Sequence, residues 1–194
     1  MDDQAVEDAV GALLSALGYG PKHFDEFDRT VVRVRRLFTE ELLAGRTTDP
    51  ASLLSDTLPA SPKGCEWIIL EQVQAVTLCP HHLMPAVGTV SLGYVPRDSM
   101  VSFGALHRLV RAATRRLILQ EESAQTIVDA LASGLNARAA ACTIRMAPTC
   151  FSAAHADGCQ AVATASAFTS TDLSRWNFRD FLQLCADGPA RAQP

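Results

Sequence analysis

The stretch Leu78-Cys79-Pro80-His81-His82-Leu83 carries the residue types most suited to chemistry. A thiolate at Cys79 and an imidazole at His82, three residues apart in a turn, can bind one zinc ion at about 2.3 Å and 2.0 Å. Two ligands are only half a site, and the same residues also fit a buried cysteine beside two histidines bonded to the backbone. A catalytic zinc site needs a third protein ligand and an open position for water. Cys150 is the best candidate, because it follows a segment expected to form a strand beside this turn, although a lone cysteine is more often inert.

Helical segments precede the part of the chain that contains these residues. Apolar residues recur at helical spacing over 5–17 and over 25–43, and Gly18 and Gly45 are expected to end the two helices. The stretch 46–64 is rich in Thr, Ser, Pro and Asp and is expected to be a loop. We therefore interpret residues 1–64 as a helical arm with a linker.

The apolar pattern after residue 65 predicts an α+β fold in the order strand, strand, helix, helix, strand, strand. An antiparallel sheet with both helices on one face follows from this order. Ser174 is expected to cap a last helix that ends before Gly188-Pro189. We expect a catalytic domain over 65–186 and a flexible tail over 187–194. The expected elements are strands over 66–78 and 87–95, helices over 105–120 and 123–135, and strands over 138–147 and 159–168, the last two joined by a loop with Cys150 and His155.

Composition and charge narrow the possible partners. The 194-residue chain has a formal net charge of −4, which argues against nucleic acid, and its cluster Arg108, Arg111, Arg115 and Arg116 fits the solvated face of a helix. No apolar run reaches the roughly 18 residues that a membrane span needs, and the acidic start of the chain is unlike a secretory signal. We therefore expect a cytoplasmic protein with reduced thiols. Two open sheet edges predict oligomerisation that continues the sheet.

Residues 75–182 resemble the catalytic domain of the GTP cyclohydrolase I family. The family's Cys-Glu-His-His turn is similar to Cys79-Pro80-His81-His82, and its Gln-Glu pair after a helical arginine is similar to Gln120-Glu121 after Arg108. The family's second zinc cysteine corresponds to Cys150. The segment 30–34, Thr-Val-Val-Arg-Val, resembles the family's Thr-Pro-x-Arg-Val.

This resemblance implies a fold, an assembly and a set of site residues. The fold would be the tunnelling fold, whose subunits form barrel rings that stack into higher oligomers such as a decamer, with active sites at subunit interfaces. Zn²⁺ would bind Cys79, His82 and Cys150, and His81 would act as general acid and base in attack on a guanine ring. Substrate would be held by a purine-edge pair and two arginines: Gln120, Glu121, Arg108 and Arg33.

Departures from the family pattern predict an altered substrate. Pro148 stands where the family has a catalytic histidine, and we expect His155 to be the candidate replacement. Gly104-Ala105 and Ala154 stand where the family has a Ser-Lys pair and an arginine that would meet a triphosphate. A guanine-like or pterin-like small molecule with little or no phosphate is therefore the expected substrate.

Three other functions remain open from the sequence. The chain can be an ordinary GTP cyclohydrolase I that makes 7,8-dihydroneopterin triphosphate, or an inactive homologue that keeps zinc as a structural ion. It can also belong to the nitrile-reducing branch of the same fold, in which Cys79 would be a free nucleophile without metal. The adjacent histidines at positions 81 and 82 argue against that branch.

Overall fold

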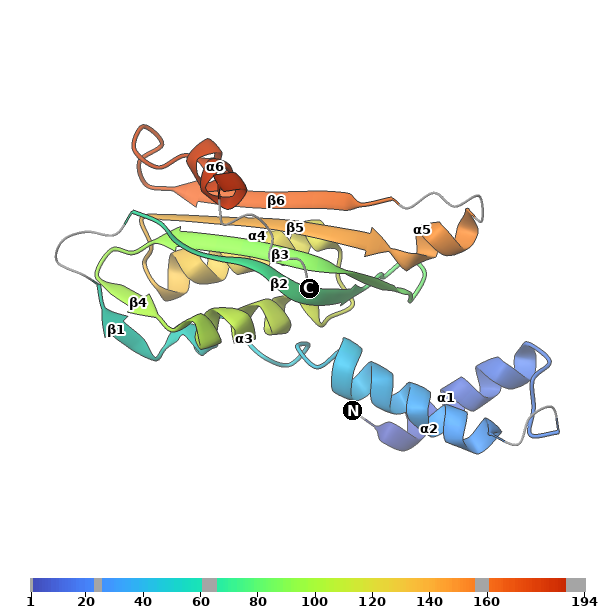
Figure 1. Ribbon diagram of the computed structural model, residues 1–194. Helices are drawn as coiled ribbons and strands as arrows, with labels where there is room; N and C mark the ends of the chain where they lie inside the picture. The colour runs from blue at the N-terminus through green and yellow to red at the C-terminus, as the bar shows by residue number, and fades with distance from the viewer. Residues whose placement is uncertain (1, 23–25, 61–65, 156–160, 188–194) are drawn as a thin grey trace. The chain divides into compact units, whose positions relative to one another are not determined.

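The computed structural model describes residues 2–22, 26–60, 66–155 and 161–187. The chain divides into two compact units, residues 1–44 and residues 45–194, which we describe separately (Figure 1).

The first unit is a pair of helices. Helix α1 spans Asp3–Ala16 and is capped by Asp2, whose carboxylate accepts a hydrogen bond from the Ala5 backbone N–H. Helix α2 spans Phe27–Arg36 and continues into a π-helical turn, η1, over Leu37–Leu42. The prediction of one α-helix over 25–43 is therefore wrong in its last turns. There the backbone carbonyl of residue i accepts a hydrogen bond from the N–H of residue i+5, as in Phe38 with Leu43.

An arginine network joins these helical segments. The half-buried guanidinium of Arg35 lies 3.3 Å from the Asp3 carboxylate, 3.2 Å from Glu7 and 2.8 Å from Glu40. Hydrogen bonding to Glu7 is the main reason that the pKa of Arg35 is raised above its usual value. The ion pairs connect α1 to α2 and η1.

The second unit is built on a four-stranded antiparallel sheet in the order β2-β3-β5-β6. On β3, the side chains of Val90, Leu92 and Tyr94 lie on the same face of the sheet and are fully buried in the core. The register between β2 and β3 shifts between Leu70 and Val73, at Gln72, whose φ is 55°. The strands are β2 (Ile68–Leu78), β3 (Pro85–Val95), β5 (Ala139–Pro148) and β6 (Ala163–Ser170).

Helices cover both faces of this sheet. Helices α3 (Phe103–Thr114) and α4 (Gln120–Gly134) pack their apolar sides on the face that carries Leu92 and Tyr94 (Figure 1). Helix α6 (Phe178–Asp187) lies on the opposite face, since a Cβ added at Gly93 would come within 3.2 Å of the Phe181 ring. The predicted strand and helix order, with both core helices on one face, is confirmed.

Several predicted boundaries are wrong. The helix expected over 105–120 ends at Thr114, because residues 116–118 bond to strand β2. The expected loop 46–64 contains a 3₁₀ helix, η2 (Ala51–Leu54), and strand β1 (Thr57–Pro59), which pairs with β4 (Ser99–Val101). The expected loop with Cys150 and His155 contains a short helix, α5 (Thr149–Ala154).

The start of the last helix also differs from the prediction. The backbone N–H of Asp180 donates to the side-chain oxygen of Asn177, so Asn177 caps α6. Ser174 instead bonds Asp172, through both its backbone N–H and its hydroxyl. These bonds lower the pKa of Asp172. No helix in the described part of the chain has the length and apolar character needed to cross a bilayer.

Candidate metal centre

The turn between β2 and β3 places two of the predicted ligands. The backbone N–H of Cys79 donates to the carbonyl of Met84 at 2.9 Å, and the N–H of Leu83 donates to the carbonyl of Cys79 at 2.9 Å. Leu83 has a φ of 54°, in the left-handed region that costs a branched residue about 1–2 kcal/mol. This tightly bonded turn brings the Cys79 sulfur within 3.9 Å of the His82 Nδ1 atom.

The third predicted ligand comes from the end of β5. Strand β3 pairs with β5 as far as Ala86 with Pro148, and the chain then turns into α5 at Thr149. Cys150 is therefore the second residue after the last strand pair, beside the β2–β3 turn. The Thr149 hydroxyl donates to the carbonyl of Pro85 at 2.6 Å, on the neighbouring strand.

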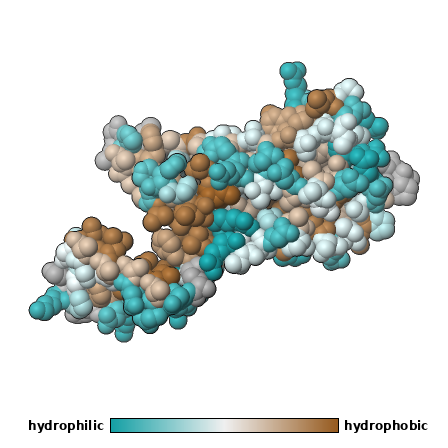
Figure 2. All heavy atoms as spheres, turned by 180° about the vertical axis from the view of Figure 1, so that it is seen from behind, coloured by the Kyte–Doolittle hydropathy of each residue, from teal (hydrophilic) through white to brown (hydrophobic). Residues whose placement is uncertain are grey.

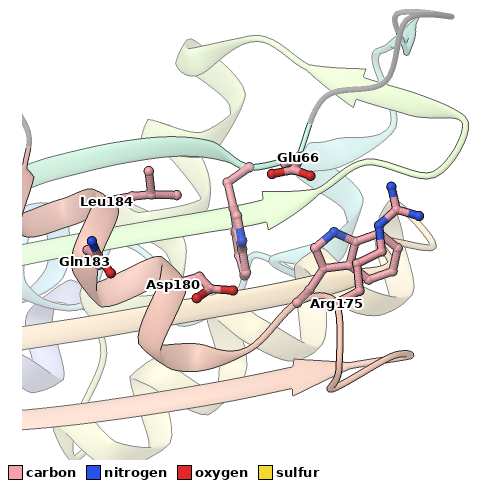
Figure 3. Close-up of a pocket in the computed structure, with 7 residues that line it drawn as sticks. Glu66, Arg175, Asp180, Gln183 and Leu184 are labelled. Atoms are coloured by element: carbon pink, nitrogen blue, oxygen red, sulfur yellow. The ribbon is translucent and has the colours of Figure 1, made fainter.

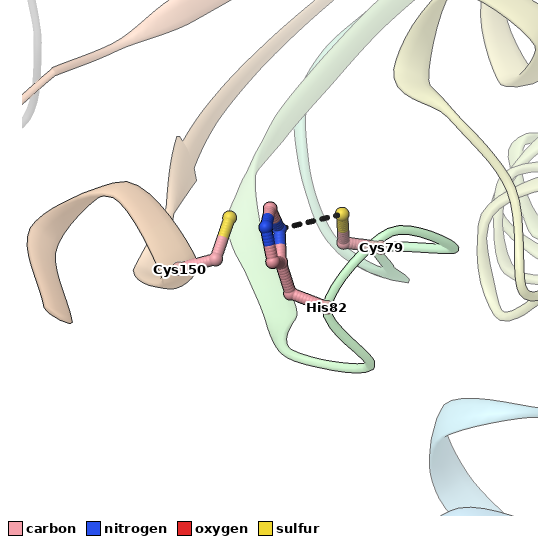
Figure 4. A group of neighbouring side chains, drawn as sticks. All are labelled: Cys79, His82 and Cys150. Carbon is pink, nitrogen blue, oxygen red and sulfur yellow. Dashed lines mark hydrogen bonds between the residues drawn. The ribbon is translucent and has the colours of Figure 1, made fainter. Parts of the chain in front are cut away.

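Cys79, His82 and Cys150 form one cluster (Figure 4). Their ligand atoms all lie within 4.8 Å of one another, with the two cysteines half-buried and the histidine exposed. Tetrahedral zinc bonds to sulfur and nitrogen place ligand atoms roughly 3.5–3.8 Å apart, so movements of about an ångström would close this group on one ion. Two thiolates and one imidazole are a donor set typical of catalytic zinc. The residues present therefore fit a zinc ion.

The other described cysteines lie in environments that disfavour the thiolate. Cys142 is fully buried in the core, and burial raises the pKa of its thiol. Burial, with a smaller contribution from Glu71, raises the pKa of Cys185 to about 12. Neither thiol is suited to metal binding, because the thiolate is the ligand form. Cys65 and Cys159 lie outside the described residues.

The connection between α3 and α4 is hydrogen-bonded to Leu78, the last residue of β2 before the β2–β3 turn. The N–H of Leu78 donates to the carbonyl of Arg116 at 3.0 Å, and the N–H of Ile118 donates to the carbonyl of Leu78 at 3.1 Å. Gln120 and Glu121 follow at once, in the first turn of α4, where Gln120 is half-buried and Glu121 exposed. The pair therefore starts the second core helix, whereas the sequence placed Gln120 at the end of the first.

The two predicted arginines lie on different units. Arg108 is exposed on α3, and its guanidinium extends back along the helix, so that a Cβ added at Gly104 would lie 3.6 Å from Nη1. Arg33 belongs to the first unit, where its guanidinium pairs with Glu26 at 3.0 Å.

The two predicted proton-transfer histidines have different surroundings. His81 is exposed in the β2–β3 turn, with its ring centre 6.2 Å from that of His82. His155 stacks on Phe151 at 4.3 Å, and its Nδ1 atom lies 3.0 Å from the Phe151 carbonyl. The imidazole of His155 is thus engaged with its own short helix.

Sequence reasoning missed the residues that hold the ligand-bearing segments together. The Thr149 hydroxyl bonds α5 to β3. The Arg116 guanidinium donates hydrogen bonds to the carbonyls of Ala112 and Thr48, and the Arg116 carbonyl accepts one from the N–H of Leu78. Except for the bond from Arg116 to Ala112, these contacts join residues far apart in the chain, and no local pattern marks them.

A separate pocket lies at the other end of β2, away from the metal cluster (Figure 3). It is formed by the residues just before β2 together with α6 and the turn that precedes it. Arg175 stacks over the Trp176 ring at 4.9 Å, and Asp180 bonds Asn177. The lining residues are Glu66, Trp67, Arg175, Trp176, Asp180, Gln183 and Leu184.

Comparison with known proteins matches nearly the whole chain to one family. A family model described as GTP cyclohydrolase I matches residues 6–182. A protein named GTP cyclohydrolase 1 from Desulforamulus reducens is 34% identical over 132 residues, covering 68% of each chain. One of the same name from Campylobacter lari is 30% identical over 172 residues, covering 89% of this chain and 86% of its own.

A solved structure resembles the chain only slightly. The apo crystal structure of the archaeosine synthase QueF-Like aligns with 56% of this chain and 96% of its own, with 18% identity and a TM-score of 0.42. A likeness of this extent supports no conclusion about fold or function. The family model, by contrast, matches residues 6–182, and the relative from Campylobacter lari aligns with 89% of this chain. This chain therefore belongs to the GTP cyclohydrolase I family.

Proposed function

We propose that the protein is a zinc-dependent hydrolase that acts on a guanine-type purine or a pterin-like heterocycle. The observation that carries this proposal is the cluster of Cys79, His82 and Cys150 in a chain of the GTP cyclohydrolase I family. A zinc ion with three protein ligands keeps an open position and lowers the pKa of a bound water towards 7. A cytoplasmic setting, in which thiols stay reduced, suits such a centre.

His81 is the proposed general acid and base. Its imidazole is exposed in the same turn as two of the proposed ligands, so it can face a substrate beside the metal. An imidazole titrates near neutrality and can both take and return a proton. His155 is proposed as a second proton donor in place of the family histidine that Pro148 replaces. The contact of its Nδ1 atom with the Phe151 carbonyl, at 3.0 Å, leaves Nε2 as the ring nitrogen for that role.

Glu121 and Gln120 are the proposed readers of the heterocycle. A carboxylate that faces two parallel N–H groups matches the edge of a guanine ring. The bonds of Leu78 to Arg116 and Ile118 support this assignment, because they place the start of α4 next to the strand that leads into Cys79. The amide of Gln120 would hold the same base.

The proposed substrate carries little or no phosphate. By resemblance, a triphosphate would meet a Ser-Lys pair and an arginine where this chain has Gly104, Ala105 and Ala154. Each lost charge-assisted contact costs about 1.5–3 kcal/mol. Arg108 and Arg33 are the remaining cations proposed for substrate binding. Two cations would bind a triphosphate, with nearly four negative charges, only weakly.

Assembly is proposed to complete the site. Strands β2 and β6 are the two edges of the sheet, and pairing between copies would continue it. Large apolar side chains are also exposed on the second unit, among them Phe103 at 60% and Leu173 at 68%, and Figure 2 shows apolar side chains among polar ones on one face. We propose a homo-oligomer of stacked rings with active sites between subunits.

The test is a turnover and binding screen of the zinc-loaded protein with guanine, guanosine, GTP and pterins. We expect hydrolytic ring opening of a compound with little or no phosphate, and weak binding of GTP. Efficient GTP turnover, which yields a fluorescent pterin after oxidation, would instead establish the ordinary activity that the names of the relatives favour. A zinc ion with four protein ligands and no hydrolysis of any compound would indicate an inactive homologue.

A further inference from the structure

At the end of strand β5, a side chain adds a hydrogen bond to the backbone pairing with β3. The last register pair of the two strands joins Ala86 to Pro148, and a proline has no N–H to donate to a ladder. One step further, the Thr149 hydroxyl donates to the Pro85 carbonyl at 2.6 Å. This hydroxyl continues the strand pairing by one step, at the point where the chain leaves the sheet.

The segment after this bond has little other support. Helix α5 has six residues, none of them buried, and Pro148 at its N-cap position makes no side-chain capping bond. Within the described ranges, we find no second side-chain hydrogen bond from α5 to the sheet. The His155 ring, at the end of α5, bonds back to Phe151 inside the helix. The position of α5 on the sheet therefore depends strongly on Thr149.

Cys150 is the next residue along the chain, and Pro85 lies three residues after His82. The Thr149–Pro85 bond thus joins the two segments that carry the ligand cluster, close to the ligands in both of them. We propose that Thr149 is a positioning residue of the metal centre, which sets the Cys150 sulfur opposite Cys79 and His82. This inference rests on the proposed zinc site. Mutation of a group that orients a metal-binding side chain typically weakens metal affinity by roughly ten- to a hundredfold.

The test compares zinc affinities of the full chain, measured by competition with a chromophoric chelator. Thr149→Val keeps the shape of the side chain and removes the hydroxyl, and we expect zinc binding to weaken about ten- to a hundredfold. Thr149→Ser keeps the hydroxyl and should bind zinc like the original protein. Thr143→Val, on the strand β5 that leads to Thr149, is the matched control, because no partner of the Thr143 hydroxyl is found among the described residues. It should leave zinc affinity unchanged.

Absorption spectra with Co²⁺ in place of zinc give a second readout. Thiolate-to-metal absorption should fall in Thr149→Val and persist in Thr149→Ser. If the valine variant does not fold, Thr149→Ala takes its place with the same expectations. Unchanged affinity in Thr149→Val, equal loss in the serine variant, or equal loss in Thr143→Val would each overturn the role of Thr149. An original protein that binds no zinc would overturn the metal centre itself, and this inference with it.

Discussion

Single residues distinguish the cluster cysteines from the other described thiols. Cys150→Ser removes one proposed thiolate ligand, so we expect zinc content after dialysis to fall well below one ion per chain. Cys185→Ser is the control, since burial raises the pKa of that thiol to about 12. Metal analysis of the purified variants by mass spectrometry measures both. Full zinc occupancy in Cys150→Ser would remove this residue from the site.

The purine-reading role of Glu121 can be tested against its neighbour. Glu121→Gln removes one carboxylate charge from the first turn of α4, and the loss of a charge-assisted bond should weaken guanosine binding by about 1.5–3 kcal/mol. Glu122→Gln changes the same charge at the next exposed position and should have little effect. Isothermal titration calorimetry with the zinc-loaded protein measures both dissociation constants. Equal effects would point to the helix dipole or net charge rather than to a specific contact.

The site was predictable from the sequence where its residues are close along the chain. The spacing of Cys79 and His82 within one turn predicted two cluster members, and the expected strand before Cys150 indicated the third. The hydroxyl bond from Thr149 to Pro85 spans 64 residues. Such a contact depends on strand register, which local spacing does not specify.

At the scale of elements, the close approach of β3 and β5 depends on a glycine. A Cβ added at Gly88 would lie 1.9 Å from the carbonyl oxygen of Arg145, so Gly88→Ala must separate the strands. We expect the free energy of unfolding to fall by at least about 2 kcal/mol. Denaturant unfolding followed by tryptophan fluorescence measures this change.

A second glycine provides the control for that substitution. A Cβ at Gly104 meets its nearest neighbour at 3.6 Å, which is ordinary contact. Gly104→Ala on α3 should therefore leave stability unchanged or raise it by up to about 1 kcal/mol. A tolerated Gly88→Ala would show that β3 and β5 are farther apart than described here.

Helices and strands were predictable where the period of the apolar residues specifies them. Their ends were not predictable where hydrogen bonds to a distant strand end a helix. The alternation of Val90, Leu92 and Tyr94 correctly predicted a strand with these three side chains on one face, in the core. The apolar stripe of α3 appeared to run on to residue 120, because Leu117 continues its spacing. The helix ends earlier because the backbone at residues 116 and 118 bonds Leu78, and a local pattern carries no information about that partner.

At the scale of the whole molecule, the two open edges of the sheet lead to a prediction about assembly. Because unpaired edge strands favour pairing with another copy, we expect light scattering coupled to gel filtration to give a mass several times that of the 20.8 kDa chain, and ten times that mass for two stacked rings of five. A mass equal to one chain at micromolar concentration would contradict the proposed assembly and its interface active sites.

The most direct test of the proposed metal centre is X-ray absorption spectroscopy at the zinc edge of the purified protein. The proposal predicts about one zinc per chain, with two sulfur neighbours at about 2.3 Å and nitrogen or oxygen neighbours at about 2.0 Å. In Cys150→Ser loaded with added zinc, the sulfur count should fall to one. A protein purified without metal, or a zinc ion with no sulfur neighbours, would contradict the assignment of Cys79, His82 and Cys150.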